Sequence, residues 1–258
     1  PQFSKGREMT REFIGGEDKM DFRYWSNNLG SLIKLHLDSM YDESDLVKEF
    51  DLEGKLETQA TYGNLQLGDE GSRRFIQSGY RFYERDGERF VVIVSQDQDG
   101  DQRIVYITTQ EGRGLELLDE LEEDFYANGP LNGAFIDMDY NFIKRSEMVD
   151  ELLAWNPNIR KQLEKDVLDF LELMPILCER GLPNSRGIIL SGAPGTGKTM
   201  YAKSIAAEAA TTTILISAEM IRQRHDIKST FKLARKLAPT LIIIEDIDTA
   251  GTVSRKFT

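Results

Sequence analysis

The chain has 258 residues, of which 40% are hydrophobic, enough for two modest domains that each bury a core. Its 44 acidic and 32 basic side chains give a formal net charge of −12, which argues against a nucleic-acid surface built from clustered Lys and Arg. The single cysteine, Cys178, excludes an intrachain disulfide and suits a reducing compartment. No apolar run approaches the ~20 residues that span a bilayer, and no leader-like pattern opens the chain, so we expect a cytoplasmic protein without a membrane segment.

The first 60 residues have the weakest pattern, and 1–60 is predicted only as a segment of unclear fold. A strand over 31–37 and a short acidic helix over 44–50 are the elements that the sequence favours there.

A clearer pattern begins at residue 73, where three β-rich runs are separated by Asp-Gly pairs at 86–87 and 99–100. Asp-Gly supplies the positive φ values that tight hairpins need, so an antiparallel meander is predicted. The apolar spacing of 115–125 indicates a helix, and the alternating run FIDMDYNFI adds a strand. We therefore expect an α+β domain over 61–145.

A different pattern follows from 146 to 258. Asn156 is a predicted N-cap and Pro157 fits the first helical position, so a helix is expected to run past Cys178 and to close near Gly181. Cys178 is expected to be a small buried hydrophobic residue of that helix. Strands then alternate with helices, which indicates a parallel sheet with flanking helices, an α/β fold. The expected strands are 187–192, 212–217 and 240–246, and the expected helices are 197–210 and 226–238.

The segment GAPGTGKT, residues 192–199, matches G-x-x-x-x-G-K-[ST] in full. Its glycines let backbone N–H groups surround phosphate oxygens, and the helix that begins there adds its positive dipole end. Lys198 brings a charge to the β- and γ-phosphates, and the Thr199 hydroxyl is a ligand for Mg²⁺. A glycine loop without chemical purpose is the alternative, and the strand-loop-helix context disfavours it. The predicted nucleotide-binding residues are Gly192, Ala193, Pro194, Gly195, Thr196, Gly197, Lys198, Thr199 and Met200.

The segment LIIIEDID, residues 241–248, places two carboxylates after a buried strand. Ligands bind outside the carboxyl ends of parallel strands, so Glu245 and Asp246 are predicted beside the phosphate loop. One carboxylate there can hold the hydration shell of Mg²⁺, and the next can orient and deprotonate an attacking water. An acidic strand end exposed to solvent is the alternative. Lys203, on the same helix as the loop, is expected to be solvated, and Asp248 fits either a cap or a contact with another subunit.

These two motifs together resemble the AAA+ ATPases, and within them the AAA branch proper, over about residues 150–248. The resemblance implies a P-loop NTPase core, ATP and Mg²⁺ as cofactors, a homo-oligomeric ring, most often a hexamer, and a protein substrate or adaptor. In most of the family the acidic pair reads Asp-Glu, whereas here the order is reversed. By position, Glu245 takes the metal role and Asp246 the water role, with Lys198 as the third catalytic residue. Asp246 is one methylene shorter than the usual Glu, which allows a slow enzyme.

The Glu-Asp order also resembles the mitochondrial AAA proteins that translocate the folded Rieske iron–sulfur subunit. Their membrane anchor has no counterpart here, and proteasome-type or katanin-like AAA proteins are equally compatible. AAA domains continue past the acidic pair to a sensor residue, arginines and a helical lid, so we expect 258 residues to be an incomplete chain. No pore-loop residue is assigned.

Three functional hypotheses follow from these motifs. The first is Mg²⁺-dependent ATP hydrolysis coupled to protein remodelling, unfolding or translocation. The alternative is a nucleotide-gated assembly module with little or no hydrolysis, which the reversed acidic pair motivates. A DNA-directed motor is disfavoured by the acidic charge balance, and no nucleic-acid partner is expected.

Overall fold

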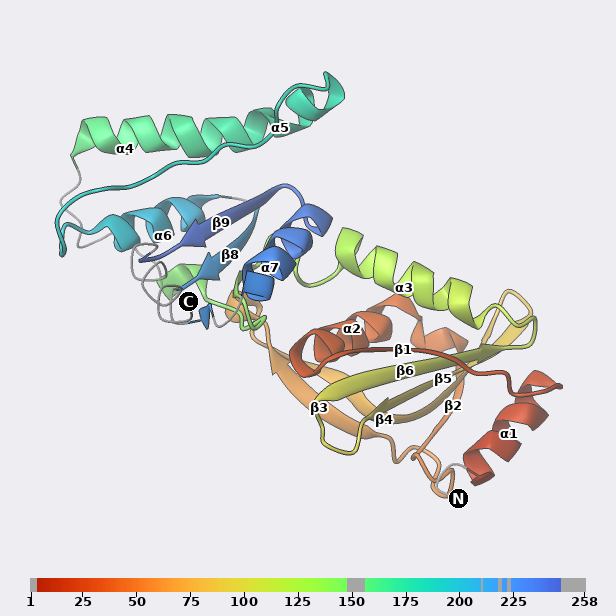
Figure 1. Cartoon of the computed structure of the whole chain (residues 1–258). Coiled ribbons are helices and arrows are strands. Elements are labelled where there is room, and N and C mark those ends of the chain that lie inside the picture. Colours follow the sequence, from red (N-terminus) through yellow and green to blue (C-terminus); the bar gives the residue numbers. More distant parts are fainter. Residues whose placement is uncertain (1–3, 148–155, 210, 218–219, 222–223, 247–258) are drawn as a thin grey trace. The chain divides into compact units, whose positions relative to one another are not determined.

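A computed structural model of the chain describes residues 4–147, 156–209, 211–217, 220–221 and 224–246 and divides into two compact units, Pro1–Pro130 and Leu131–Thr258 (Figure 1). Each unit has its own sheet and its own core. The first is mixed α and β around an antiparallel sheet, and the second is α/β around a parallel sheet.

The first unit is built on six antiparallel strands in the order β1-β6-β5-β4-β2, with β3 paired to β4. The predicted meander is confirmed as β4, β5 and β6, and the β4–β5 turn has φ of 52° at Asp86 and 84° at Gly87. The strands are β1 (Asp21–Ser26), β2 (Leu46–Phe50), β3 (Thr61–Gln66), β4 (Ser72–Arg85), β5 (Glu88–Gln96) and β6 (Gln102–Thr109).

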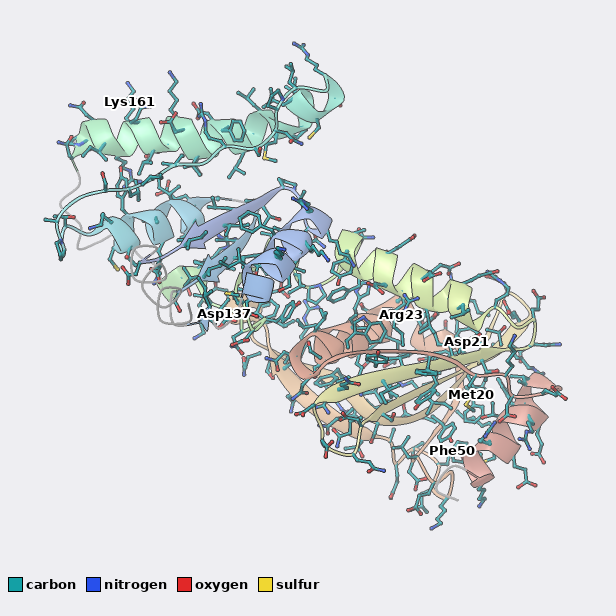
Figure 2. The ribbon with its side chains drawn as sticks, viewed as in Figure 1. Met20, Asp21, Arg23, Phe50, Asp137 and Lys161 are labelled. Atoms are coloured by element: carbon teal, nitrogen blue, oxygen red, sulfur yellow. The ribbon has the colours of Figure 1, made fainter. Side chains whose placement is uncertain are left out.

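Helices cover both faces of this sheet. Side chains alternate along a strand, so Tyr80 and Phe82 of β4 pack with Ile14 of α1, whereas Arg81 and Tyr83 between and after them face α2. The predicted helix near 115–125 is confirmed as α3. Arg23 of β1, labelled in Figure 2, forms ion pairs with two residues of α3, Glu122 (2.8 Å) and Asp119 (2.7 Å). The helices are α1 (Ser4–Ile14), α2 (Asn27–Met40) and α3 (Gly114–Asn128), with 3₁₀ turns η1 (Glu43–Asp45) and η2 (Gly68–Glu70).

Two elements predicted in the first 60 residues are wrong. The predicted strand over 31–37 is part of α2, which buries every residue from Gly30 to Leu37 and therefore lacks the polar face that marks an amphipathic helix. The predicted helix over 44–50 is η1 followed by β2. Because β1 pairs with β6 and β2 with β4, residues 1–60 are part of the same fold as the meander, not a separate segment.

A buried polar network lies between α2 and the sheet. Lys34 is fully buried and its Nζ donates hydrogen bonds to the backbone oxygens of Gln77 (2.8 Å) and Ser95 (2.7 Å). Burial lowers the pKa of Lys34 to about 7; the charge of Arg103 acts in the same direction and that of Asp38 opposes it.

Arg81 is the cation of a second group in this network. It pairs with Asp38 (2.6 Å) and Glu49 (2.7 Å), and it also contacts the hydroxyls of Tyr62 and Tyr83. Burial alone would lower the pKa of Arg81, but these anionic and phenolic partners raise it above its ordinary value. The guanidinium therefore stays charged inside the unit.

The second unit contains a parallel sheet in the order β7-β8-β9, which confirms the predicted α/β architecture. The FIDMDYNFI run, expected in the first domain, contributes β7 to this sheet because it pairs with β8, and the units divide after Pro130, not near 145. Helix α6 packs Ala206 against Phe135 and Ile243 of the sheet. The elements are β7 (Phe135–Asp137), the 3₁₀ turn η3 (Arg145–Glu147), α6 (Lys198–Glu208), β8 (Thr212–Ile216), α7 (Arg224–Lys236) and β9 (Thr240–Ile244).

The predicted helix from Asn156 is confirmed. The Asn156 side chain accepts a hydrogen bond from the backbone N–H of Asn158 (3.0 Å), and Pro157 is in the first turn. The helix runs as α4 (Pro157–Leu163), a π-helical turn η4 (Glu164–Leu168) and α5 (Asp169–Glu179). It closes at Gly181, which has φ of 63° and donates its N–H to Cys178 O (3.0 Å).

The predicted strand over 187–192 is wrong. This segment forms no strand and pairs with none among the described residues, and Ile189 is 87% exposed. Both edges of β8 are already taken, by β7 and by β9. A β-branched apolar run shows that a strand is locally favourable, but it cannot supply the neighbour whose hydrogen bonds complete one.

Candidate active site

The loop before α6 adopts a curve that depends on its glycines. Gly195 and Gly197 have φ of 76° and 84°, a left-handed conformation that residues with a Cβ rarely adopt. Thr196 closes the curve because its hydroxyl donates to the backbone oxygen of Ala193 (2.9 Å). Gly197 is the N-cap of α6, and its carbonyl accepts the N–H of Tyr201 (2.9 Å). The N–H groups of the first helical turn therefore lie next to the loop.

Lys198 is the first residue of α6, and its side chain folds back onto the loop. Its Nζ donates to the backbone oxygens of Gly192 and Ala193, both at 2.9 Å. These bonds hold a positive charge against the loop's own carbonyls. Thr199 and Met200 follow in the first turn with exposed side chains. Loop amides, an ammonium and a hydroxyl are thus gathered within one short segment, and Pro194 lies in the same exposed stretch.

The two predicted carboxylates have different environments at the end of β9. The N–H of Glu245 donates to Ile216 O (2.9 Å), so its backbone continues the pairing with β8. Its side chain is 14% exposed, and its Oε1 lies 3.0 Å from Nζ of Lys203 on α6. Asp246 is exposed and has φ of 50°, so the backbone turns directly after Glu245. The Glu245 side chain is thus largely shielded and ion-paired, whereas the Asp246 residue is exposed.

Two residues differ from their sequence predictions. Lys203 is not solvated as predicted: its side chain is 20% exposed and pairs with Glu245. Its position four residues after Thr199, on the same face of α6, is the sequence signal that could have identified it. Cys178, predicted to be buried, is exposed, and the Asn184 amide donates to its sulfur (2.9 Å). Asp248 lies outside the described residues.

Helix α6 packs against the α4–η4 segment. Tyr201 and Ile205 of α6 are 5% and 4% exposed and pack with Leu163 at the end of α4. The ion pair between Arg160 and Glu208 (2.8 Å) joins the same elements at the other end of α6. This packing fixes the helix whose N-terminus carries the loop.

The residues present fit a magnesium–nucleotide complex. Left-handed glycines, an ammonium and helical N–H groups suit phosphate, and a hydroxyl with a nearby carboxylate suits a hydrated Mg²⁺. Lys198 would bind the phosphates, and Thr199 with Glu245 would hold the metal. The described residues contain no group of three or more His, Cys, Asp or Glu side chains placed to bind a metal by themselves. Nor do they include a helix long and apolar enough to cross a membrane.

Comparison with known proteins finds sequence similarity to ATPases. Residues 188–257 match the family described as "ATPase family associated with various cellular activities (AAA)". The proteasome-activating nucleotidase of Methanocaldococcus jannaschii is 36% identical over 109 residues, which cover 36% of this chain and 25% of that protein. The ATP-dependent zinc metalloprotease FtsH of Mycoplasmopsis pulmonis is 36% identical over 93 residues, 34% of this chain and 13% of that protein.

Residues 188–257 are therefore similar to AAA ATPase domains, and such domains use ATP with Mg²⁺. The chain spans a quarter or less of the length of these curated relatives.

Proposed function

We propose that this protein hydrolyses ATP with Mg²⁺ as a homo-oligomeric AAA ring and uses the cycle to unfold, remodel or translocate protein substrates. The ring is proposed to be a hexamer, the commonest assembly in the family. The observation that carries the proposal is the pairing of two features on α6. Lys198 closes the phosphate loop at its N-terminus, and Lys203, on the same helix, contacts Glu245 at the end of β9. One helix thus connects a phosphate-binding loop to a buried carboxylate.

The residues divide the chemistry between them. Gly195 and Gly197 shape the loop that receives the phosphates, and Lys198 neutralises charge on the β- and γ-phosphoryl oxygens. Thr199 and Glu245 orient the hydrated metal, which when bound neutralises further phosphate charge. Asp246, at the exposed turn, accepts a proton from the attacking water at a carboxylate oxygen.

The subgroup, the compartment and the role of the first unit are finer parts of the proposal. The Glu-Asp order supports a relationship to the AAA proteins that translocate the folded Rieske subunit. The names of the matched relatives, a proteasome-activating nucleotidase and a metalloprotease, support an unfolding activity that acts on protein chains. A reducing, cytoplasmic location fits the single free cysteine. The first unit, expected from sequence as a domain over 61–145, would receive the substrate or an adaptor.

A second candidate is a nucleotide-gated assembly module that hydrolyses little or no ATP. The exposed, shorter carboxylate of Asp246 favours it, because a general base must reach the water whose proton it accepts. Under this hypothesis ATP binding changes the assembly state, and Asp246 contributes nothing to turnover.

Steady-state ATP hydrolysis by the full-length protein, with the assembly state measured in parallel, separates the two. Asp246→Asn is expected to bind ATP and assemble while kcat falls by about 10²-fold or more, the usual contribution of a general base. Glu245→Gln is expected to weaken the dependence on Mg²⁺. Asp86→Asn is a matched control, because Asp86 is also an exposed aspartate with a left-handed backbone (φ 52°). If the wild type assembles with ATP yet turns over no faster than Asp246→Asn, the motor proposal fails and the assembly module is favoured.

A further inference from the structure

The Lys203–Glu245 pair is unusual for an ion pair because it lacks hydrogen-bond geometry. Nζ and Oε1 are 3.0 Å apart, yet Oε1 is fully buried and accepts no hydrogen bond from the described residues. The attraction is therefore chiefly between charges. No donor among the described residues engages the lone pairs of Oε1 in a hydrogen bond.

The backbone of Glu245 cannot move far to meet another partner. Its N–H is bonded to Ile216 O, which fixes it to the sheet. Lys203 is fixed in the same way by α6, whose neighbouring residues Ser204 and Ile205 are buried. A carboxylate that is 14% exposed needs a counter-charge, and in this structure Lys203 supplies it.

The same carboxylate is the one proposed to orient Mg²⁺. Thr199 and Lys203 lie four residues apart on one face of α6, so the hydroxyl and the ammonium are neighbours on this helix, which contacts Glu245 through Lys203. A hydrated cation placed at Thr199 would be close to an existing positive charge. Two cations drawing on one carboxylate weaken each other's binding.

We propose that Lys203 is a positioning residue that competes with Mg²⁺ for Glu245, so that the metal binds only together with nucleotide phosphates, which add the negative charge that the ion pair has neutralised. This inference rests on the function proposed above. It predicts that removing the charge of Lys203 lets Mg²⁺ bind without nucleotide, which weakens the coupling between metal and nucleotide, and that this effect requires Glu245.

The test measures nucleotide affinity, not turnover. A fluorescent, non-hydrolysable ATP analogue is titrated into the 258-residue protein with excess Mg²⁺ and again with EDTA, and the ratio of the two Kd values gives the coupling. Lys203→Met should lower the coupling by about threefold or more, the effect of a unit charge a few ångströms from a cation in a water-like dielectric. Lys203→Arg should restore the wild-type ratio. Lys232→Met, at an exposed lysine of α7, controls for the change in net charge.

Three results would overturn the inference. The first is a Lys203→Met protein that keeps the wild-type circular dichroism and melting temperature and shows an unchanged or raised coupling. The second is an equal fall in the Glu245→Gln background, where no carboxylate remains to compete for, because Lys203 would then act without this carboxylate. The third is a wild type that binds no nucleotide, and this result alone would also remove the proposed function.

Discussion

The buried ammonium of Lys34 should make the stability of the first unit depend on pH. Its pKa is lowered from 10.5 to about 7, first by burial and then by the charge of Arg103. Between these values the unfolded chain holds a proton that the folded chain does not, so unfolding takes up a proton and stability rises with pH. Below pH 7 Lys34 is protonated in both states, so the full cost of burying the charged ammonium is present and this site no longer makes the stability depend on pH.

The magnitude follows from the shift. The pKa of Lys34 differs by about 3.5 between the unfolded and folded chain. At ~1.4 kcal/mol per pKa unit, the free energy of unfolding changes by roughly 5 kcal/mol over the whole window and by about 3 kcal/mol between pH 7 and 9.5. The neutral amine still has two N–H groups for the oxygens of Gln77 and Ser95. Lys34→Met removes both donors at a cost of about 1–3 kcal/mol for each unsatisfied oxygen, but that cost does not change with pH.

Urea unfolding of wild type and Lys34→Met at several pH values measures the effect. Trp25 of β1 is 8% exposed and reports on the first unit, and Trp155→Phe in both proteins leaves it as the only tryptophan. The difference in unfolding free energy, wild type minus variant, should grow in favour of the wild type by about 3 kcal/mol from pH 7 to 9.5. Lys19→Met makes the same side-chain change at an exposed position. A difference for Lys34→Met that stays constant across this range would refute the account.

Three further changes test the packing. Gly79→Ala should destabilise the first unit by about 1–3 kcal/mol in urea unfolding, because φ is 149° and a Cβ would lie 2.7 Å from the Cβ of Ala60 and 2.8 Å from Phe50 O; a neutral result would show that β4 shifts freely. Arg81→Met should lower the free energy of unfolding by about 3–5 kcal/mol, because it leaves two buried carboxylates without their cation. A variant as stable as wild type at pH 7 would contradict this. Tyr201→Ala should lower the local stability around α6 by about 3–5 kcal/mol, because Tyr201 packs with Leu163 of α4. The loss should appear as faster proteolysis between α5 and α6, and unchanged cleavage would argue against this packing.

Sequence-based prediction is most accurate where a residue's role is local. Asn156 caps, Pro157 begins a helix and Asp86-Gly87 turns a hairpin, each through its own backbone preferences, and all three are as predicted. The phosphate loop belongs to the same class, because its glycines act on their own φ angles. Such signals need no knowledge of distant neighbours.

Predictions that depend on distant partners are less accurate. Helix α2 is buried from Gly30 to Leu37, so its sequence shows no helical stripe, and the pattern resembles a strand. The run at 187–192 has strand-like residues but no strand beside it in the described part of the chain. Lys203 and Cys178 differ from expectation for the same reason, since burial on a helix depends on what packs against it.

The reversed order of the acidic pair has a structural reason at the end of β9. Position 246 has φ of 50°, a left-handed conformation in which Asp is several-fold enriched and longer side chains are not. Position 245 is fixed to the sheet through Ile216, and its side chain must reach the ammonium on α6, which the extra methylene of Glu favours. The order Glu-Asp thus matches a long side chain to the buried, paired position and a short one to the exposed turn. Under the proposed roles, the carboxylate with the shorter reach is the one that activates water, so the proposal predicts slow ATP hydrolysis as the main consequence of the reversal.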